Sequence, residues 1–373
     1  MKQDYYRRLP HVISYWDHEG LVLENYAVRT RVGVAPEAAL LLSAAARWRT
    51  VEDFCRRFAD FAPASVRESL RLLARHKFLE RVRAAAPPRD EPRFLPHWRE
   101  WTPAAAYFHF TTKDAKFTSD PAKEMRFYRA RVRQWPVPPP VKRYSRSQQI
   151  ALPALARADH FTEVLHARRT WRRFSREPLA LADLSALLRL TWGVQQWMQF
   201  PVLGRLARKT SPSGGARHPI EAYVVALHVA GLRPGIYHYA ADAHHLARIR
   251  YGATPQMVAE FFPSQWWYRD AAAIFFMTAV FERTQWKYPA PRSYRVVLGD
   301  AGHLGQTFCL AATWLGLAPF CTMALAESKI ERALRLDGVT ESVIYATGVG
   351  QRPNDTSDPG DLPGQISPKL IPV

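Results

Sequence analysis

The chain has 373 residues, 47% of them hydrophobic, so it is long enough for two domains and apolar enough to fold. Its 52 Lys and Arg exceed its 33 Asp and Glu, which favours polyanionic partners such as nucleic acid, acidic peptides or a phosphorylated cofactor. No apolar run approaches bilayer length and the N-terminus lacks the apolar core of a signal peptide, so we expect a cytoplasmic protein without a membrane partner.

Cysteine and histidine usage predicts no metal site. Cys55, Cys309 and Cys321 lie far apart, without metal-ligand spacing. The histidines, His218 among them, lack cysteine or carboxylate companions at such spacing. We therefore expect free, buried thiols in a reducing compartment.

Residues 18–83 predict a small helical module. Helices are expected over 36–47, from a capping box (TVED) over 50–60, and from Pro63 onwards, and a short strand follows at 78–82. Three helices followed by a strand is the order of a winged helix-turn-helix.

Two functions fit this module, and a purely structural role is the third possibility. Its third helix carries Arg67, Arg71 and Arg75 on one side, which suits DNA. Its strand suits the binding of a peptide by strand addition. The residues alone do not decide among the three.

Residues 84–158 form a connector rich in proline and arginine. The prolines include Pro87, Pro88, Pro136 and the run at 138–140. Its aromatic side chains indicate that part of it packs on a surface. They are Trp98, Trp101, Tyr107, Phe108 and Phe110.

Residues 159–352 show the pattern of an α+β domain, and 353–373 form a C-terminal tail. Helices are expected over 161–166, 181–195 and 293–315. The expected strands of one mixed sheet are 222–227, 235–239, 245–249, 272–281, 319–323 and 342–349. No glycine fingerprint follows a strand, which argues against a nicotinamide-binding Rossmann domain.

Two motifs in this domain point to a phosphorylated, planar cofactor. The 168–174 segment (RRTWRRF) holds four arginines and a threonine, a donor set that suits phosphate. The small residues at 213–216 (SGGA) let a backbone approach a flat or anionic ligand and expose N–H donors to it. A solvated helix face and an ordinary loop are the alternative interpretations.

Five segments in this order resemble the SagB/ThcOx-type (McbC-like) dehydrogenases, the azoline-oxidising branch of the nitroreductase superfamily. They lie at 168–174, 212–223, 286–295, 302–317 and 344–350. The resemblance covers roughly residues 160–352. It implies an FMN-dependent, homodimeric α+β fold, a mixed sheet flanked by helices, with the flavin at the dimer interface.

The resemblance also implies roles for individual residues. The candidates for holding the ribityl phosphate are Arg168, Arg169, Thr170, Arg172 and Arg352. The candidates for lying beside the isoalloxazine ring are Pro212, Ser213, Gly214 and Gly215. Gly302, His303 and Gln306 are expected to begin or line the long helix near the flavin of the same or the partner subunit. Thr170 stands where relatives usually have serine, which keeps the hydroxyl.

Lys287 and Tyr288 match the lysine–tyrosine pair that is associated with azoline oxidation in this family. The reaction sends a hydride to flavin N5 and a proton to a base. Both side chains ordinarily have a pKa of about 10, so we expect burial and neighbouring arginines to lower that of Lys287, and the adjacent ammonium to lower that of Tyr288. Pro289 and Pro291 follow, where relatives have a shorter, glycine-containing link, and an exposed loop pair is the alternative interpretation.

These observations lead to one main hypothesis and two alternatives. The main one is an FMN oxidoreductase that dehydrogenates thiazoline or oxazoline in a ribosomally made peptide, with O2 as reoxidant. Its N-terminal module recognises a leader peptide, and a cyclodehydratase is a partner. The second keeps FMN but takes another amino-acid-derived or carrier-bound intermediate. The third, ranked last, is a flavin-sensing DNA-binding protein.

Overall fold

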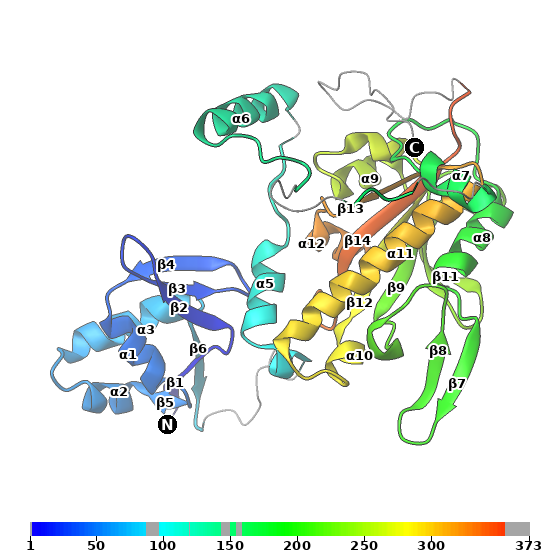
Figure 1. The fold of residues 1–373 in the computed structure, drawn as a ribbon. Coiled ribbons are helices and arrows are strands. Elements are labelled where there is room, and N and C mark those ends of the chain that lie inside the picture. The colour runs from blue at the N-terminus through cyan, green and yellow to red at the C-terminus, as the bar shows by residue number, and fades with distance from the viewer. Residues whose placement is uncertain (1, 87–96, 119, 143–149, 154–158, 355–373) are drawn as a thin grey trace. The chain divides into compact units, whose positions relative to one another are not determined.

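The computed structural model describes residues 2–86, 97–118, 120–142, 150–153 and 159–354 (Figure 1). The chain divides into two units, which are described separately. The first comprises Met1–Lys113 and Gln285–Tyr294, and the second comprises Asp114–Thr284 and Arg295–Val373.

Residues 2–86 of the first unit form two small antiparallel sheets and three helices. One sheet has the order β5 (Arg49–Thr50), β1 (Gln3–Arg8), β6 (Leu79–Ala84). The other has the order β2 (Val12–Trp16), β3 (Leu21–Asn25), β4 (Thr30–Val34). The helices are α1 (Glu37–Ala44), α2 (Val51–Arg57) and α3 (Pro63–Arg75). The capping box is present, with Thr50 and Asp53 satisfying each other's backbone N–H.

The four strands that precede α1 were not expected from the sequence. β1 pairs with β6 along its whole length, from Gln3 opposite Ala84 to Arg8 opposite Leu79, so this sheet includes residues well before 18. Its sequence is QDYYRR, in which only the two consecutive tyrosines are buried. Because buried residues do not alternate with exposed ones, the usual strand signal is missing.

Part of the predicted connector belongs to the first unit as the short helix η1 (Arg99–Trp101) and α5 (Ala104–Thr112). Trp98 and Trp101 are completely buried, and their rings meet edge to face 5.8 Å apart. His109 Nδ1 lies 2.9 Å from the hydroxyl of Tyr294. The sequence predicted that these aromatics pack, but not that they form helices.

The second unit is built on a six-stranded sheet with the order β11, β10, β9, β12, β14, β13. In that order the strands are His245–Tyr251, Gly235–Ala240, Ile220–Ala226, Ala273–Val280, Glu341–Gly350 and Ala318–Thr322. All neighbouring pairs in it are antiparallel, where a mixed sheet was expected. A separate hairpin consists of β7 (Gln196–Phe200) and β8 (Gly204–Arg208).

The helices of the second unit agree with the expected ones and add others. They are α6 (Pro121–Gln134), α7 (His160–Ala167), α8 (Leu181–Thr191), α9 (Pro255–Phe261), α10 (Phe281–Gln285), α11 (Tyr294–Trp314) and α12 (Glu327–Leu334). α8 ends four residues before its expected end. A Cβ at Gly193 would lie 2.5 Å from the carbonyl oxygen of Arg189, so glycine is needed where the chain leaves this helix.

Helices cover both faces of the sheet. On one face, Ile274 and Phe276 of β12 pack with residues of α9, α12 and the short helix η3 (Trp266–Asp270). On the other face, Phe275 stacks on Trp192, which follows α8, and packs 4.8 Å from the ring of Phe308 of α11. Figure 1 shows α11 running along the sheet across β12 and β14. This long helix carries much of the candidate site.

Phe320 provides a test of the core of the second unit. Its side chain is completely buried and stacks on Tyr268. We expect Phe320→Ala to lower the free energy of unfolding by about 3–5 kcal/mol, because it leaves a cavity in a close-packed core. Urea unfolding measures this. Phe161→Ala is the control, since Phe161 is 64% exposed, and should change stability by no more than about 0.5 kcal/mol. Equal losses would contradict the assigned core.

Candidate functional site

The loop at residues 211–218 is fastened to α11 by Asp300. The Asp300 carboxylate accepts hydrogen bonds from Ser213 Oγ at 2.5 Å and from the Gly214 N–H at 3.2 Å. Ser211 Oγ lies 2.7 Å from Thr307 Oγ1 of the same helix. The His218 N–H donates to Ser213 Oγ at 2.9 Å, which closes the loop on itself.

Burial raises the pKa of Asp300, and the hydrogen bonds from Ser213 and Gly214 oppose that rise. Sequence reasoning did not select Asp300. A carboxylate inside a mostly apolar helix was its only sequence signal. In the structure it fixes the position of the loop relative to the helix.

Gly214 and Gly215 of this loop are glycines for two different structural reasons. A Cβ on Gly214 would lie 2.2 Å from Cγ1 of Val296 on α11, so only glycine allows this close packing. Gly215 has a φ of +63°, which glycine adopts without strain. The N–H groups of Gly214, Ala216 and Arg217 are all bonded within the protein. The expectation that the loop exposes these N–H groups to a ligand was therefore wrong, because Asp300 and the turn itself use them.

An exposed face of α11 borders this loop. Gly302, His303 and Gln306 are exposed on it, and His303 Nδ1 lies 3.3 Å from the carbonyl oxygen of Pro212. A Cβ at Gly299 or Gly302 would meet no heavy atom within 4 Å. The helix backbone at Gly299 and Gly302 is thus open to close approach by another group.

The 168–174 segment runs beside β13 and the end of β14. The Trp171 N–H donates to the carbonyl oxygen of Pro319, and the buried Trp171 ring lies 5.3 Å from the guanidinium of Arg352. Arg352 Nε donates to the carbonyl oxygen of Leu317 at 3.0 Å. Arg169 donates to the carbonyl oxygens of His166 and Arg168, at the end of α7.

Arg168 lies near the thiols of Cys309 and Cys321, which the sequence analysis expected to be free, buried and far apart in the chain. A hydrogen bond between Cys309 of α11 and Cys321 of β13 raises the pKa of Cys309 and lowers that of Cys321. The charge of Arg168 lowers the pKa of both. This electrostatic contact places Arg168 near the β13 side of α11.

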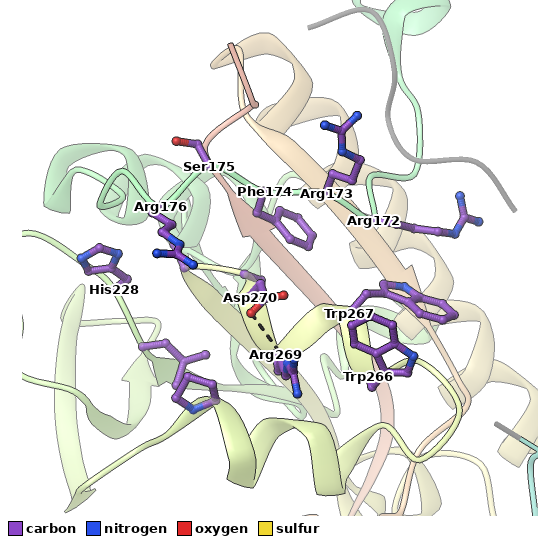
Figure 2. A pocket seen from close by; sticks show the side chains of 14 residues that line it. Arg172, Arg173, Phe174, Ser175, Arg176, His228, Trp266, Trp267, Arg269 and Asp270 are labelled. Atoms are coloured by element: carbon purple, nitrogen blue, oxygen red, sulfur yellow. Dashed lines mark ion pairs between the residues drawn. The ribbon is translucent and has the colours of Figure 1, made fainter. Parts of the chain in front are cut away.

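Arg172 lines a cavity of about 550 Å³ (Figure 2). Around it Figure 2 shows Arg173, which belongs to the predicted phosphate-binding segment, together with Arg176, Arg269, Trp266 and Trp267, which sequence reasoning did not assign to a site. The Asp270 carboxylate lies 3.8 Å from Nε of Arg269. With four guanidinium groups and one carboxylate, this cavity suits an anionic group.

Lys287 and Tyr288 lie in the first unit, whereas all other candidate residues lie in the second. Trp101 Nε1 donates to the carbonyl oxygen of Tyr288 at 3.3 Å, and the Ala290 N–H bonds the same oxygen at 2.8 Å. Lys287 Nζ lies 5.7 Å from the centre of the Tyr288 ring. The short helix η4 (Pro291–Ser293) follows. The buried Trp101 thus supports the backbone of this pair, a role that its sequence did not reveal.

Within the described ranges, no group of three or more His, Cys, Asp or Glu is arranged to hold a metal ion. In those same ranges, no helix combines the length and apolar character needed to cross a bilayer.

Asp300→Ala tests the anchoring of the loop. Removing the carboxylate leaves the Gly214 N–H and the Ser213 hydroxyl without their acceptor, so the free energy of unfolding should fall by about 1–3 kcal/mol. Hydrogen exchange at the amides of 213–218 should become faster than in the parent protein. Asp270→Ala, at a 60% exposed carboxylate, is the control. Unchanged exchange in Asp300→Ala would contradict the anchoring role.

His218 makes stability depend on pH. Burial, helped by the charge of Lys209, lowers its pKa to about 4, while the unfolded value is about 6.5. Between these values the unfolded chain binds a proton that the folded chain does not, so stability falls as pH falls from about 6.5 to 4. In His218→Gln this fall should be smaller by up to about 3 kcal/mol. Denaturant unfolding at several pH values measures this difference, and His160→Gln, at an exposed histidine, is the control. If the stability of His218→Gln and that of the parent fell in parallel with pH, the role of His218 would be refuted.

Comparison with known proteins places the second unit in a family. The nitroreductase family matches residues 165–351, half of the chain. The trifolitoxin-processing protein TfxB of Rhizobium leguminosarum bv. trifolii is 36% identical over 181 residues, which are 47% of this chain and 48% of that protein. The chain thus spans about half the length of this relative. A nitroreductase-family protein of Methanocaldococcus jannaschii is 32% identical over 174 residues, 47% of this chain and 83% of that protein.

Among solved structures, the Escherichia coli microcin synthetase McbBCD complex with truncated pro-MccB17 bound shares the fold. The match has 19% identity and a TM-score of 0.50, and covers 72% of this chain and 100% of that one. A nitroreductase-family structure from Desulfovibrio desulfuricans in complex with FMN matches at 17% identity and a TM-score of 0.38, over 58% of this chain and 100% of that one.

The predicted nitroreductase-like α+β fold is confirmed. This chain belongs to the nitroreductase family.

Proposed function

We propose that this protein is an FMN-dependent oxidoreductase of peptide natural-product biosynthesis that dehydrogenates thiazoline or oxazoline to the azole. The observation that carries the proposal is the pair of motifs in the nitroreductase-family unit. An arginine-rich segment runs beside β13, and a loop is fastened to an exposed, glycine-bearing face of α11.

The residues present fit FMN. Arg168, Thr170 and Arg172 supply cationic and hydroxyl donors of the kind that bind a phosphate. The face of α11 formed by Gly302, His303 and Gln306 is open to a flat ring beside Pro212. When bound there, FMN supplies the hydride acceptor of the reaction. The protein's own part is to hold the ring against α11, orient the substrate and accept a proton.

We propose that Lys287 or Tyr288 is the base that accepts the proton removed from the substrate. Both have a basic form that can accept a proton from the heterocycle, and they are adjacent, so one can receive it while the other orients the substrate. The bond from Trp101 to the Tyr288 carbonyl oxygen keeps the backbone of the pair in one position. Pro289 and Pro291 stiffen the chain immediately after it.

A peptide substrate is supported by two of the matched proteins. One is named for the processing of trifolitoxin, and the other is a synthetase complex with a bound pro-peptide. The first unit of this chain adds a structural argument for a peptide substrate. β6 is an edge strand of the described three-stranded sheet, and an extended leader peptide can pair with such an edge. We propose leader recognition there, with a homodimer and a cyclodehydratase partner completing the working assembly.

FMN and riboflavin together test the phosphate assignment. Arg168→Met removes a charge-assisted hydrogen bond to phosphate, so FMN should bind about 10- to 100-fold more weakly. Riboflavin lacks the phosphate and should bind equally well to the variant and the parent. Flavin fluorescence titration measures both, with exposed Arg126→Met as control. Equal weakening of FMN and riboflavin would contradict the assignment.

A synthetic azoline peptide tests the reaction. Lys287→Ala and Tyr288→Phe should each retain FMN but lower turnover at least about 100-fold, since general base catalysis contributes that much. Mass spectrometry detects the loss of two hydrogens. Turnover that survives both substitutions would rule out this pair as the base. Oxidation of free amino-acid-derived compounds in place of the peptide would favour the alternative substrate class.

A further inference from the structure

A second cavity, of about 490 Å³, borders the 211–218 loop. The loop contributes Ala216, Arg217 and His218 to its wall. The β7–β8 hairpin, β9, β10, α10 and the residues that follow β8 and β10 contribute the other side chains used below. They are Trp197, Arg205, Lys209, Glu221, His238, Asp242 and Arg283.

One carboxylate of this cavity is already neutralised. Glu221 accepts hydrogen bonds from His238 Nε2 at 2.8 Å and from Arg283 Nη1. Burial alone would raise the pKa of Glu221, but these two partners outweigh it and hold the pKa at about 2. Arg283 also donates to the carbonyl oxygen of His218 at 3.0 Å. Glu221 and Arg283 therefore form a fixed pair that leaves little charge for a ligand.

Lys209 differs from the paired Glu221 and Arg283. Its ammonium forms no hydrogen bond or ion pair with the part of the chain that the structure describes. Burial, the largest cause, lowers the pKa of Lys209 and the charge of Arg283 lowers it further, whereas the charges of Glu221 and Asp242 raise it. Lys209 also lines a small neighbouring pocket with Pro212, Ser213 and Asp300. A half-buried cation thus stands between this cavity and the loop assigned to the flavin.

The other side chains that line the cavity restrict the charge and shape of the ligand that it can bind. Arg205 and Arg217 add positive charge, and Asp242 is a second carboxylate. Because Glu221 is already paired, the charge of Asp242 is the one that favours a singly charged anion over a dianion such as phosphate. The indole of Trp197, with the guanidinium of Arg205 stacked 3.9 Å from its centre, offers a flat apolar surface to the body of the ligand.

We propose that this cavity is a carboxylate-binding subsite for the substrate, in which Lys209 pairs with one carboxylate. That the carboxylate belongs to a peptide rests on the proposed function. Its source is either an acidic side chain or a terminal carboxyl group. A bound carboxylate supplies the hydrogen-bonded ion pair that Lys209 does not form with the described residues, and it stabilises the protonated amine.

Protection from acetylation tests the subsite on the full-length protein. A carboxylate paired with Lys209 holds the amine protonated, so acetic anhydride should label it several-fold more slowly. The probes are N-acetylaspartate α-amide for a side-chain carboxylate, N-acetylglycine for a terminal one, N-acetylglycinamide as neutral control, and inorganic phosphate. Mass spectrometry reads the rate at Lys209, with exposed Lys329, 3.4 Å from Glu260, as the internal reference.

Protection of Lys209, but not Lys329, by either carboxylate supports the proposal, and the stronger of the two identifies the source. No protection by either, equal protection by the neutral amide, or stronger protection by phosphate would overturn it.

Variants separate this proposal from the proposed function. The better carboxylate probe should bind Lys209→Met about tenfold or more weakly by calorimetry, and Lys209→Arg should restore most of the affinity. Lys329→Met is the matched control and should bind like the parent. Unchanged affinity in Lys209→Met would overturn the subsite. Flavin content and azoline oxidation are measured separately, so a protein that binds the carboxylate but oxidises no peptide would refute only the function.

Discussion

The candidate site depends on one contact, the hydrogen bonds that the Asp300 carboxylate accepts from Ser213 and Gly214. Asp300 lies on α11, and α11 is held against the sheet by Phe308, which packs on Phe275 of β12. The loop therefore takes its position from the core of the unit. A binding surface held by rigid elements can present a ligand in one orientation, which a flavin enzyme requires.

Several arginine side chains of this chain contact aromatic rings, whereas others pair with carboxylates. Arg352 lies over Trp171, and Arg205 lies over Trp197. The cavity in Figure 2 combines arginines with Trp266 and Trp267. Such contacts keep a guanidinium in place without neutralising it, so its charge remains available to an anion.

Much of the second unit could be predicted because its signals are local. The strand at 272–281 is a continuous apolar run, and the observed β12 is Ala273–Val280. The helix expected over 293–315 is α11, Tyr294–Trp314. In the first unit β1 was missed, since its two buried tyrosines are consecutive and its other residues are polar or charged. Pairing with β6, more than 70 residues away, forms this strand.

The candidate site was predicted in part, for a physical reason. Arginines and glycines mark a phosphate or a close approach in any fold, so the 168–174 segment and the loop could be selected. Asp300 and Lys209 could not, because each matters only through residues that are distant in sequence. The Gly214 N–H also shows the limit of motif reasoning, since Asp300 uses the donor that a ligand was expected to take.

The most direct test of this account is the visible absorption spectrum of the purified full-length protein, followed by heat release and identification of the chromophore. The account predicts a flavin spectrum and one FMN released per chain. A colourless protein that added FMN cannot reconstitute would contradict it, because the arginine segment and the loop on α11 would then have no cofactor to hold.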